Sequence, residues 1–164
     1  MLEMLQKNAG RSGETSTVVQ STQLVIDDKY CELVADFVRS AKSEIRMCAY
    51  AWRWYENEPE IGIQKLNIEL LLARSRGVKV RCMVDNLTQK ERFATLGFDA
   101  RSVSNTRMLH TKAFCIDAKT LIIGSHNMTK RATTDNYEMS ILTQEPEPCL
   151  QFIDYFDKMW DSRG

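Results

Sequence analysis

The sequence predicts an α/β domain in which a mixed, mostly parallel sheet carries helices on both faces. Two strands of the buried type, at 45–52 and 78–84, flank a helical segment at 61–76. A second helical segment at 88–96 follows and leads to a short strand near 100–103. Strands that alternate with helices in this way form right-handed crossovers, which pack helices on both faces of a sheet.

The length and composition of the chain indicate one soluble globular domain. Its 164 residues suffice for one hydrophobic core, and 43% hydrophobic and 27% charged residues are ordinary proportions. We expect a flexible N-terminal lead-in over residues 1–16 and a single domain over residues 17–164. Residues 1–5 are mostly apolar but too few for a signal sequence or a membrane span. We therefore expect a cytoplasmic protein without stable membrane association.

The first elements of the domain are an edge strand and a helix. Weak alternation of apolar residues over 17–26 indicates the strand. Apolar residues then recur at helical spacing over 28–43, and Asp27 or Asp28 is placed to cap that helix.

An aromatic and basic segment, Arg53 to Tyr55, follows the strand at 45–52. Trp54 could stack a nucleobase, a contact worth roughly 1–3 kcal/mol, or it could simply pack on the domain. The sequence leaves both interpretations open. The two helices that come after it are ended by Gly77 and Gly97.

The last third of the chain contains a polar loop, a strand and a helix. The loop at 128–135 carries Lys130 and Arg131, which could contact a phosphate backbone or could be solvated. A strand is expected at 137–143. The final helix, at 148–161, is expected to turn three apolar side chains toward the sheet, Ile153, Phe156 and Trp160.

The five cysteines are odd in number, widely spaced and mostly within apolar runs. They are Cys31, Cys48, Cys82, Cys115 and Cys149. This distribution is typical of reduced core residues and not of a disulfide framework or a zinc site.

Two apolar runs separated by a short polar break predict a β-hairpin at 109–127. A two-residue loop would pair Asp117 with Thr120, and would set Lys112 opposite Ser125 and His110 opposite Asn127. Those four polar side chains would then share one face. A shift of one residue in the register would distribute them over both faces.

An imidazole, an ammonium group, a hydroxyl and a carboxamide on one face suit a phosphoryl group that gains negative charge. His110 can attack or carry a proton near neutral pH, while Lys112 and Asn127 can hold non-bridging oxygens. A histidine considered alone is more often a satisfied core or surface residue. The surrounding set favours the catalytic interpretation.

The pattern His110-x-Lys112-x4-Asp117-x6-Gly124-Ser125-x-Asn127 resembles the HKD signature of the phospholipase D superfamily. Several fixed positions at fixed spacings make the motif specific. The resemblance extends over about residues 28–162 and predicts a phospholipase D-like fold. One copy of the motif is present, as in the small single-motif nucleases of the superfamily, whereas its lipases carry two.

The resemblance implies a role for each residue of the set. His110 would attack phosphorus to form a phosphohistidine, Lys112 and Asn127 would hold the non-bridging oxygens, and Ser125 would support them. Glu138 stands where the family places the carboxylate that orients the nucleophilic histidine. No cofactor and no metal are expected, because Lys112 in the middle of the set would repel a cation.

Two further residues of this region are assigned by strand parity. Asp117 falls on the opposite face from His110, so we expect it to hold the hairpin turn and to act only indirectly. His126, between Ser125 and Asn127, points away from the set and cannot be the second histidine that the mechanism needs. A two-fold homodimer that brings His110 of each chain to a shared site would supply that general acid.

The substrate is expected to be nucleic acid. The formal net charge is zero, so any nucleic-acid surface must be local. Basic residues do outnumber acidic ones around the motif, and a neutral chain favours a single strand of DNA or RNA in a groove. The sequence thus predicts a metal-independent endonuclease. The alternatives are a phospholipid hydrolase, disfavoured by the single motif and the lack of a membrane-binding segment, and a non-catalytic nucleic-acid-binding protein.

Overall fold

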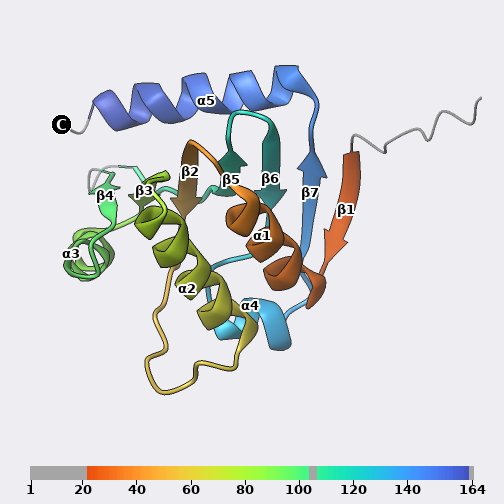
Figure 1. Ribbon diagram of the computed structural model, residues 1–164, viewed down its shortest axis with the longest axis vertical. Helices are drawn as coiled ribbons and strands as arrows, with labels where there is room; N and C mark the ends of the chain where they lie inside the picture. Colours follow the sequence, from red (N-terminus) through yellow and green to blue (C-terminus); the bar gives the residue numbers. More distant parts are fainter. Residues whose placement is uncertain (1–21, 104–106, 163–164) are drawn as a thin grey trace, which may run out of the picture.

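The computed structural model describes residues 22–103 and 107–162. The expected lead-in at 1–16 and the first part of the strand expected at 17–26 lie outside these ranges. Within them, a seven-stranded sheet with the order β1-β7-β6-β5-β2-β3-β4 carries helices on both faces (Figure 1). This arrangement confirms the predicted α/β class.

The helices and strands follow the predicted order along the chain. The strands are β1 (Thr22–Ile26), β2 (Glu44–Ala49), β3 (Lys79–Val84), β4 (Asp99–Ser102), β5 (Lys112–Ile116), β6 (Thr120–Gly124) and β7 (Met139–Thr143). The helices are α1 (Lys29–Ser40), α2 (Gly62–Ser75), α3 (Leu87–Thr95), α4 (Lys130–Thr134) and α5 (Pro146–Asp161).

The structure corrects three details of these elements. The expectation of a polar loop at 128–135 was wrong, because it contains α4, whose first turn is capped by the Thr129 side chain accepting from the Ala132 N–H. The expectation of a mostly parallel sheet was also wrong. Two of the described strand pairs are parallel and four are antiparallel. Finally, β2 ends at Ala49, and Trp52 forms an isolated bridge with Met128.

The connections between strands are of two kinds. The strands β2, β3 and β4 are joined through α2 and α3, and helical crossovers of this kind return the chain parallel to itself. Strands β5 and β6 are joined by a short turn and therefore pair antiparallel. Strands β6 and β7 also pair antiparallel, although their connection contains α4.

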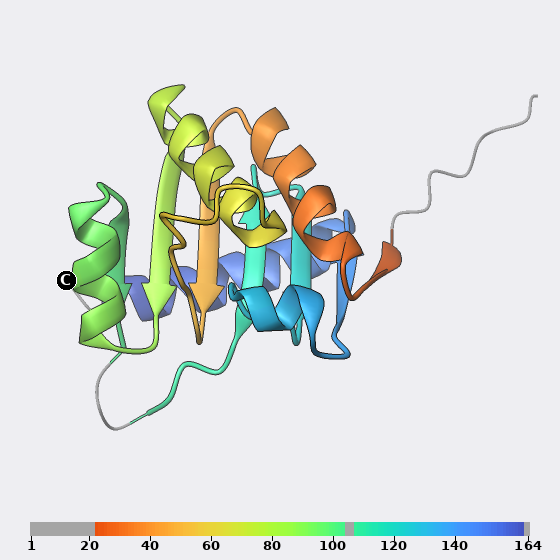
Figure 2. The same cartoon turned by 90° about the horizontal axis from the view of Figure 1, so that it is seen from below.

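The sheet has a core on each face. Helices α1 and α2 cover one face and α5 crosses the other (Figure 2). On the first face Phe114 and Ile122 pack in a cluster with side chains of α1 and α2. On the second, Phe156 and Trp160 of α5 are buried against the sheet, as predicted, whereas Ile153 is only half-buried. No helix within the described ranges is both long and apolar enough to cross a membrane.

All five cysteines are buried and free of disulfide bonds, which confirms their assignment to the core. Cys48 and Cys115 of the sheet and Cys149 of α5 lie in the cluster between α5 and the sheet. Burial raises the pKa of the Cys48 and Cys115 thiols to about 12.

Part of the sheet face that carries α5 is open and apolar. Leu121 packs in the α5 cluster, and because strand residues alternate, Ile123 faces the same side. Its neighbour in register on β7 is Ile141, and the neighbour of Ile141 on β1 is Leu24. We call the exposed apolar side chains of this face the open apolar strip, which consists of Leu24, Ile26, Ile123, Met139 and Ile141.

Candidate active site

The β5–β6 hairpin has a different register from the one predicted. Its connection is three residues long, so Ile116 pairs with Thr120, and Lys112 lies opposite Gly124 instead of Ser125. Asp117 and Ala118 adopt left-handed φ angles of 52° and 57°, which takes Asp117 out of the strand. The two-residue turn at Ala118-Lys119 was therefore a wrong prediction.

The polar residues of the motif still lie around one cavity despite the changed register, because most of them lie outside the paired strands. His110 precedes β5, and Ser125 and Asn127 follow β6, so strand alternation does not fix their directions. A cavity of about 300 Å³ is lined by His110, Lys112, Gly124, Ser125 and Asn127. We call it the His110 cavity.

Gly124 lets β6 and β7 approach closely beside this cavity. A Cβ atom at position 124 would lie 2.3 Å from the Met139 carbonyl oxygen and 2.4 Å from Ser140. Any larger residue would push β7 away from β6. It follows that no side chain stands opposite Lys112.

Lys112 is buried, with 7% of its surface exposed, and its ammonium group is fixed in place. The Nζ atom donates to the His110 carbonyl oxygen at 2.7 Å and lies 4.9 Å from the centroid of the Tyr50 ring. Burial lowers the pKa of Lys112, and the nearby charge of Glu138 opposes that shift. The positive charge is thus held where little water competes for it.

His110 is exposed, and its backbone is held on both sides. Its imidazole lies 4.9 Å from the Tyr50 ring, with the two planes tilted by 54°. The preceding Leu109 N–H donates to the Asp85 carboxylate at 2.8 Å, just after the end of β3. This role of Asp85 was not predicted, although an aspartate directly after a buried strand was a visible signal.

Asn127 has a defined orientation. Its Oδ1 atom accepts from the Ala51 N–H at 3.3 Å, which leaves the Nδ2 group as the available donor. The neighbouring backbone supports this contact, because the Met128 N–H donates to the Ala51 carbonyl and the Arg53 N–H to the Met128 carbonyl, both at 2.9 Å.

Ser125 and Glu138 form a pair at the rim of the cavity. The Ser125 hydroxyl donates to the Glu138 carboxylate and accepts from the Met139 N–H at 3.1 Å. The other Glu138 oxygen accepts from the Asn136 amide at 2.9 Å. Among the described residues no hydrogen bond joins Glu138 to His110, so Glu138 braces Ser125 in this structure.

A family model described as "Cardiolipin synthase, PLD-like domain" matches residues 34–160, which is most of the chain. The chain belongs to the phospholipase D superfamily. This finding confirms the family that the motif indicated.

Curated relatives of this phospholipase D-like chain include two mitochondrial cardiolipin hydrolases. The protein of Chlamydomonas reinhardtii is 28% identical over 132 residues, which cover 77% of this chain and 55% of that protein. The protein of Homo sapiens is 27% identical over 128 residues, covering 74% of this chain and 47% of that protein. The chain thus spans about half the length of these curated relatives.

Solved structures show the same fold over nearly their whole length. Nuc from Salmonella typhimurium, a phospholipase D family member, is 25% identical with a TM-score of 0.71, covering 87% of this chain and 97% of that chain. NucT from Helicobacter pylori matches with the same TM-score of 0.71 at 19% identity, covering 87% and 96% of the two chains. The second likeness concerns the fold alone.

The structure places Asp117 of the phospholipase D signature outside the His110 cavity, at the other end of β5. Its carboxylate accepts from the backbone N–H groups of Lys42, Ser43 and Glu44 at 2.8 to 3.0 Å, and from the Ser43 hydroxyl at 2.8 Å. Burial would raise the pKa of Asp117, but these hydrogen bonds outweigh burial and hold it low. Asp117 therefore anchors the α1–β2 connection.

His126 is a buried structural residue that points away from the His110 cavity. Its ring nitrogens contact the Ser140 hydroxyl at 2.8 Å and the Asp27 carbonyl at 3.1 Å, and the ring stacks on Tyr30 with centroids 4.2 Å apart. Burial lowers the pKa of His126, against the effect of the Asp27 carbonyl and the charge of Glu138. Its orientation agrees with the one predicted from strand parity.

The other candidate substrate contacts lie outside the His110 cavity. Trp54 packs partly against the main core and lines a separate cavity. Lys130 forms an ion pair with Glu58, and its backbone N–H donates to the Tyr55 hydroxyl at 2.8 Å. Arg131 is exposed on α4.

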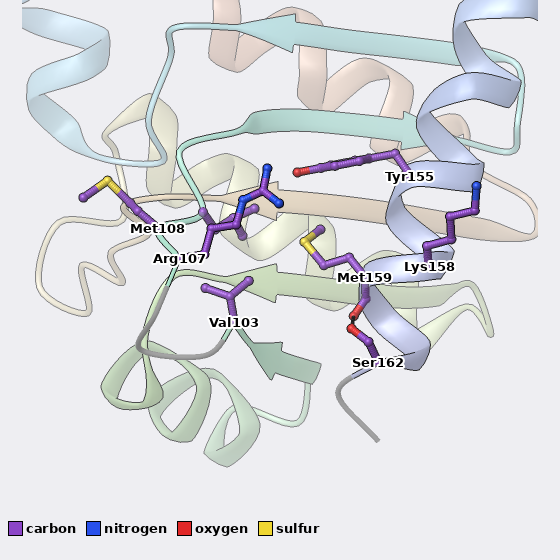
Figure 3. Close-up of a pocket in the computed structure, with 8 residues that line it drawn as sticks. Val103, Arg107, Met108, Tyr155, Lys158, Met159 and Ser162 are labelled. Atoms are coloured by element: carbon purple, nitrogen blue, oxygen red, sulfur yellow. Dashed lines mark hydrogen bonds between the residues drawn. The ribbon is translucent and has the colours of Figure 1, made fainter.

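A further cavity of about 250 Å³ lies behind the segment that leads to His110, between that segment and α5. In Figure 3 the Arg107 side chain points toward Tyr155 and Met159 of α5, whereas Met108 points away from the helix. Met108 and Tyr155 are exposed, by 62% and 46% of their surface. The face of the molecule that carries α5 is therefore hollowed next to the motif.

The side chains that line the His110 cavity are of the kinds that phosphoryl transfer requires, except that a general acid is missing. It offers a nucleophilic imidazole, two donors for non-bridging oxygens and a braced hydroxyl. Within residues 22–103 and 107–162, no group of three or more His, Cys, Asp or Glu side chains has a metal-binding arrangement. The missing group is a general acid for the leaving oxygen.

Proposed function

We propose that this chain is a metal-independent phosphodiesterase that cleaves nucleic acid, preferentially single strands, through a phosphohistidine intermediate. The observation that carries the proposal is the His110 cavity, in which the exposed imidazole of His110 stands beside the fixed donors of Lys112 and Asn127. Its lining contains no large apolar side chain that would hold an acyl chain.

The reaction proceeds in two displacements at phosphorus. An imidazole nitrogen of His110 forms a bond to phosphorus while the bond to the leaving ester oxygen breaks, and that oxygen takes a proton from a second histidine. Water then attacks phosphorus and breaks the phosphorus–nitrogen bond, while the second histidine, now neutral, accepts the proton of the water. Lys112 Nζ and Asn127 Nδ2 stabilise the charge that builds on the non-bridging oxygens in both steps.

The second histidine is His110 of another copy of the chain in a two-fold homodimer. His126 does not serve, because both of its ring nitrogens are engaged in the core. The open apolar strip supports pairing of two copies, since adjacent exposed apolar side chains on a sheet face suit an interface. The strip also adjoins the site, because the Met139 carbonyl accepts from the Ser125 N–H at 3.0 Å.

Phospholipid hydrolysis is the second candidate. The relatives named mitochondrial cardiolipin hydrolase, and a Rickettsia conorii protein named phospholipase D that is 28% identical, favour it. The polar lining of the His110 cavity favours nucleic acid. A non-catalytic role is disfavoured, because four side chains of the motif, those of His110, Lys112, Ser125 and Asn127, line one cavity.

A substrate panel tests the proposal. The purified chain and its His110→Ala variant are incubated with single-stranded DNA, single-stranded RNA, duplex DNA and cardiolipin vesicles, with and without excess EDTA. We expect cleavage of a single strand that persists in EDTA and is absent from His110→Ala. Hydrolysis of cardiolipin alone would refute the nucleic-acid assignment. Activity lost in EDTA and restored by a divalent ion would refute metal independence.

A further inference from the structure

A second cavity, of about 430 Å³, opens at the same edge of the sheet as the His110 cavity. It lies between the segment after β2 and the first turns of α3. The side chains that give it its chemistry are those of Arg53, Trp54, Tyr55, Thr88 and Arg92. The lining includes two guanidinium groups and no carboxylate, in a chain whose formal net charge is zero.

The wall of this cavity is rigid. Gln89 of α3 accepts from the Trp52 N–H at 3.0 Å through Oε1 and donates to the Tyr50 carbonyl at 3.0 Å through Nε2. Gln64 of α2 accepts from the Tyr55 N–H at 2.9 Å. The buried Gln64 and the half-buried Gln89 thus hold the segment from Tyr50 to Tyr55, so its exposed side chains start from defined positions.

Both arginines are available to a ligand. Arg53 is exposed, and within the described part of the chain its guanidinium has no hydrogen bond or ion pair. Arg92 is exposed and donates one long hydrogen bond, of 3.5 Å, to the Trp54 carbonyl. A guanidinium binds phosphate through paired donors, and an aromatic ring beside it offers a stacking surface to a base.

The backbone connects this cavity to the His110 cavity. Ala51 donates its N–H to Asn127 in the His110 cavity. Arg53 comes two residues later, a chain length of at most about 7 Å. We therefore expect a polymer bound with one phosphate at His110 to bring its next unit toward Arg53.

We propose that this second cavity is a subsite for the nucleotide that adjoins the scissile phosphate. Arg53 and Arg92 bind the neighbouring phosphate, and the half-buried Trp54 stacks the base. The inference rests on the proposed function and deepens it, because it makes the substrate a chain of nucleotides instead of an isolated diester.

The test compares a long and a short substrate. A labelled single strand of DNA or RNA occupies both cavities, whereas bis(4-nitrophenyl) phosphate occupies the His110 cavity alone. For R53Q/R92Q we expect kcat/KM for the strand, relative to kcat/KM for the small diester, to fall about 100-fold, or roughly 10-fold per arginine. Trp54→Leu is expected to lower the same ratio roughly 10-fold. Lys119→Gln is the matched control, since it removes one charge from the turn at the opposite end of β5.

Binding measured without turnover separates the two proposals. In the His110→Ala background, we expect R53Q/R92Q to weaken strand binding and to lower the salt slope of log K by about 1.4, or ~0.7 per lost contact. If the wild-type chain cleaves the strand, but R53Q/R92Q has the same kcat/KM ratio and the same salt slope as Lys119→Gln, the subsite is refuted and the proposed function stands. Strand binding that depends on both arginines, in a chain that cleaves no phosphodiester, would support the subsite and refute the proposed function.

Discussion

Lys112 and Asn127 in the His110 cavity are each held through one group while a second group stays available. Lys112 donates one of its three N–H bonds to the His110 carbonyl, and Asn127 uses its Oδ1 atom on Ala51. In the proposed reaction, the remaining Lys112 and Asn127 donors need no reorganisation when charge builds on the phosphoryl group. Fixed donors of this kind stabilise a transition state more than a ground state.

Removal of either donor is expected to slow the chemical step. Lys112→Ala and Asn127→Ala should each lower the single-turnover rate by roughly 10²–10³-fold, with a smaller effect on ground-state binding. Asn127→Asp keeps an acceptor for the Ala51 N–H but replaces the donor with a charged oxygen, so it should slow the chemical step at least as much as Asn127→Ala. Rapid-quench experiments at saturating enzyme measure these single-turnover rates. A rate within twofold of wild type for either alanine variant would exclude the substituted residue from the mechanism.

The sequence motif predicted which residues form the site, but it did not predict all the contacts between them. The motif spacing was sufficient to select His110, Lys112, Ser125 and Asn127, which the structure brings together. It was not sufficient to show that Glu138 contacts Ser125, because that contact depends on how closely β7 approaches β6 at Gly124. Such distances follow from the packing of the whole sheet.

The turn between β5 and β6 shows how one element is stabilised by another. Left-handed φ angles at Asp117 and Ala118 cost of order 1–3 kcal/mol each. The four hydrogen bonds that the Asp117 carboxylate accepts from residues 42–44 offset that cost. Those partners lie more than seventy positions away in the chain, so the local sequence could not reveal the three-residue turn.

Asp117→Ala should destabilise the fold and reduce its dependence on pH. We expect a loss of about 2 kcal/mol in the free energy of unfolding at pH 7, since hydrogen bonds to a charged acceptor are removed. Because the pKa of Asp117 is lowered in the folded state, its contribution to the free energy of unfolding is present above about pH 4 and is lost as the pH falls further. Asp117→Ala lacks this contribution, so it should lose less stability than the wild type on acidification.

Urea titrations of Asp117→Ala at pH 7 and at pH 3 measure both effects. Lys119→Gln in the same turn serves as the control, because the Lys119 side chain is exposed. Equal acid sensitivity of the wild type and Asp117→Ala would contradict the role assigned to the carboxylate.

The element pattern was predictable wherever it depended on local periodicity. Helices α2 and α3 and strand β3 fall within one residue of the predicted ranges. Helix α4 was missed because five residues hold too little periodicity to be detected. The antiparallel share of the sheet was missed because strand direction depends on pairing partners distant in sequence.

The whole molecule leaves one face of its sheet partly uncovered. Helix α5 packs on the strands from β6 to β3, and beyond it Leu24, Ile141 and Ile123 form an exposed row across three adjacent strands. A pattern of alternating apolar residues indicates that a face is buried, but it does not say whether the same chain or a second copy buries it.

Ile141→Lys should convert the proposed homodimer into a folded monomer. The substitution places a charge in the middle of the open apolar strip, where a paired surface would have to bury it at high cost. We expect a halved mass by light scattering, an unchanged circular dichroism spectrum and at least a tenfold loss of activity. Leu72→Lys, at an exposed leucine of α2 on the other side of the sheet, is the control. A monomeric wild-type chain with full activity would rule out a shared site.

The positions of the buried thiols allow cysteine alkylation to report which part of the fold has opened. Iodoacetamide reacts with thiolates, and the pKa values of about 12 at Cys48 and Cys115 leave almost none in the folded state. Cys149 of α5 lies in one cluster with Cys48 and Cys115 of the sheet, so detachment of that helix alone would expose these three thiols and add up to three alkyl groups. Complete unfolding would add five. The mass spectrum of a briefly alkylated sample would therefore distinguish detachment of one helix from loss of the entire fold.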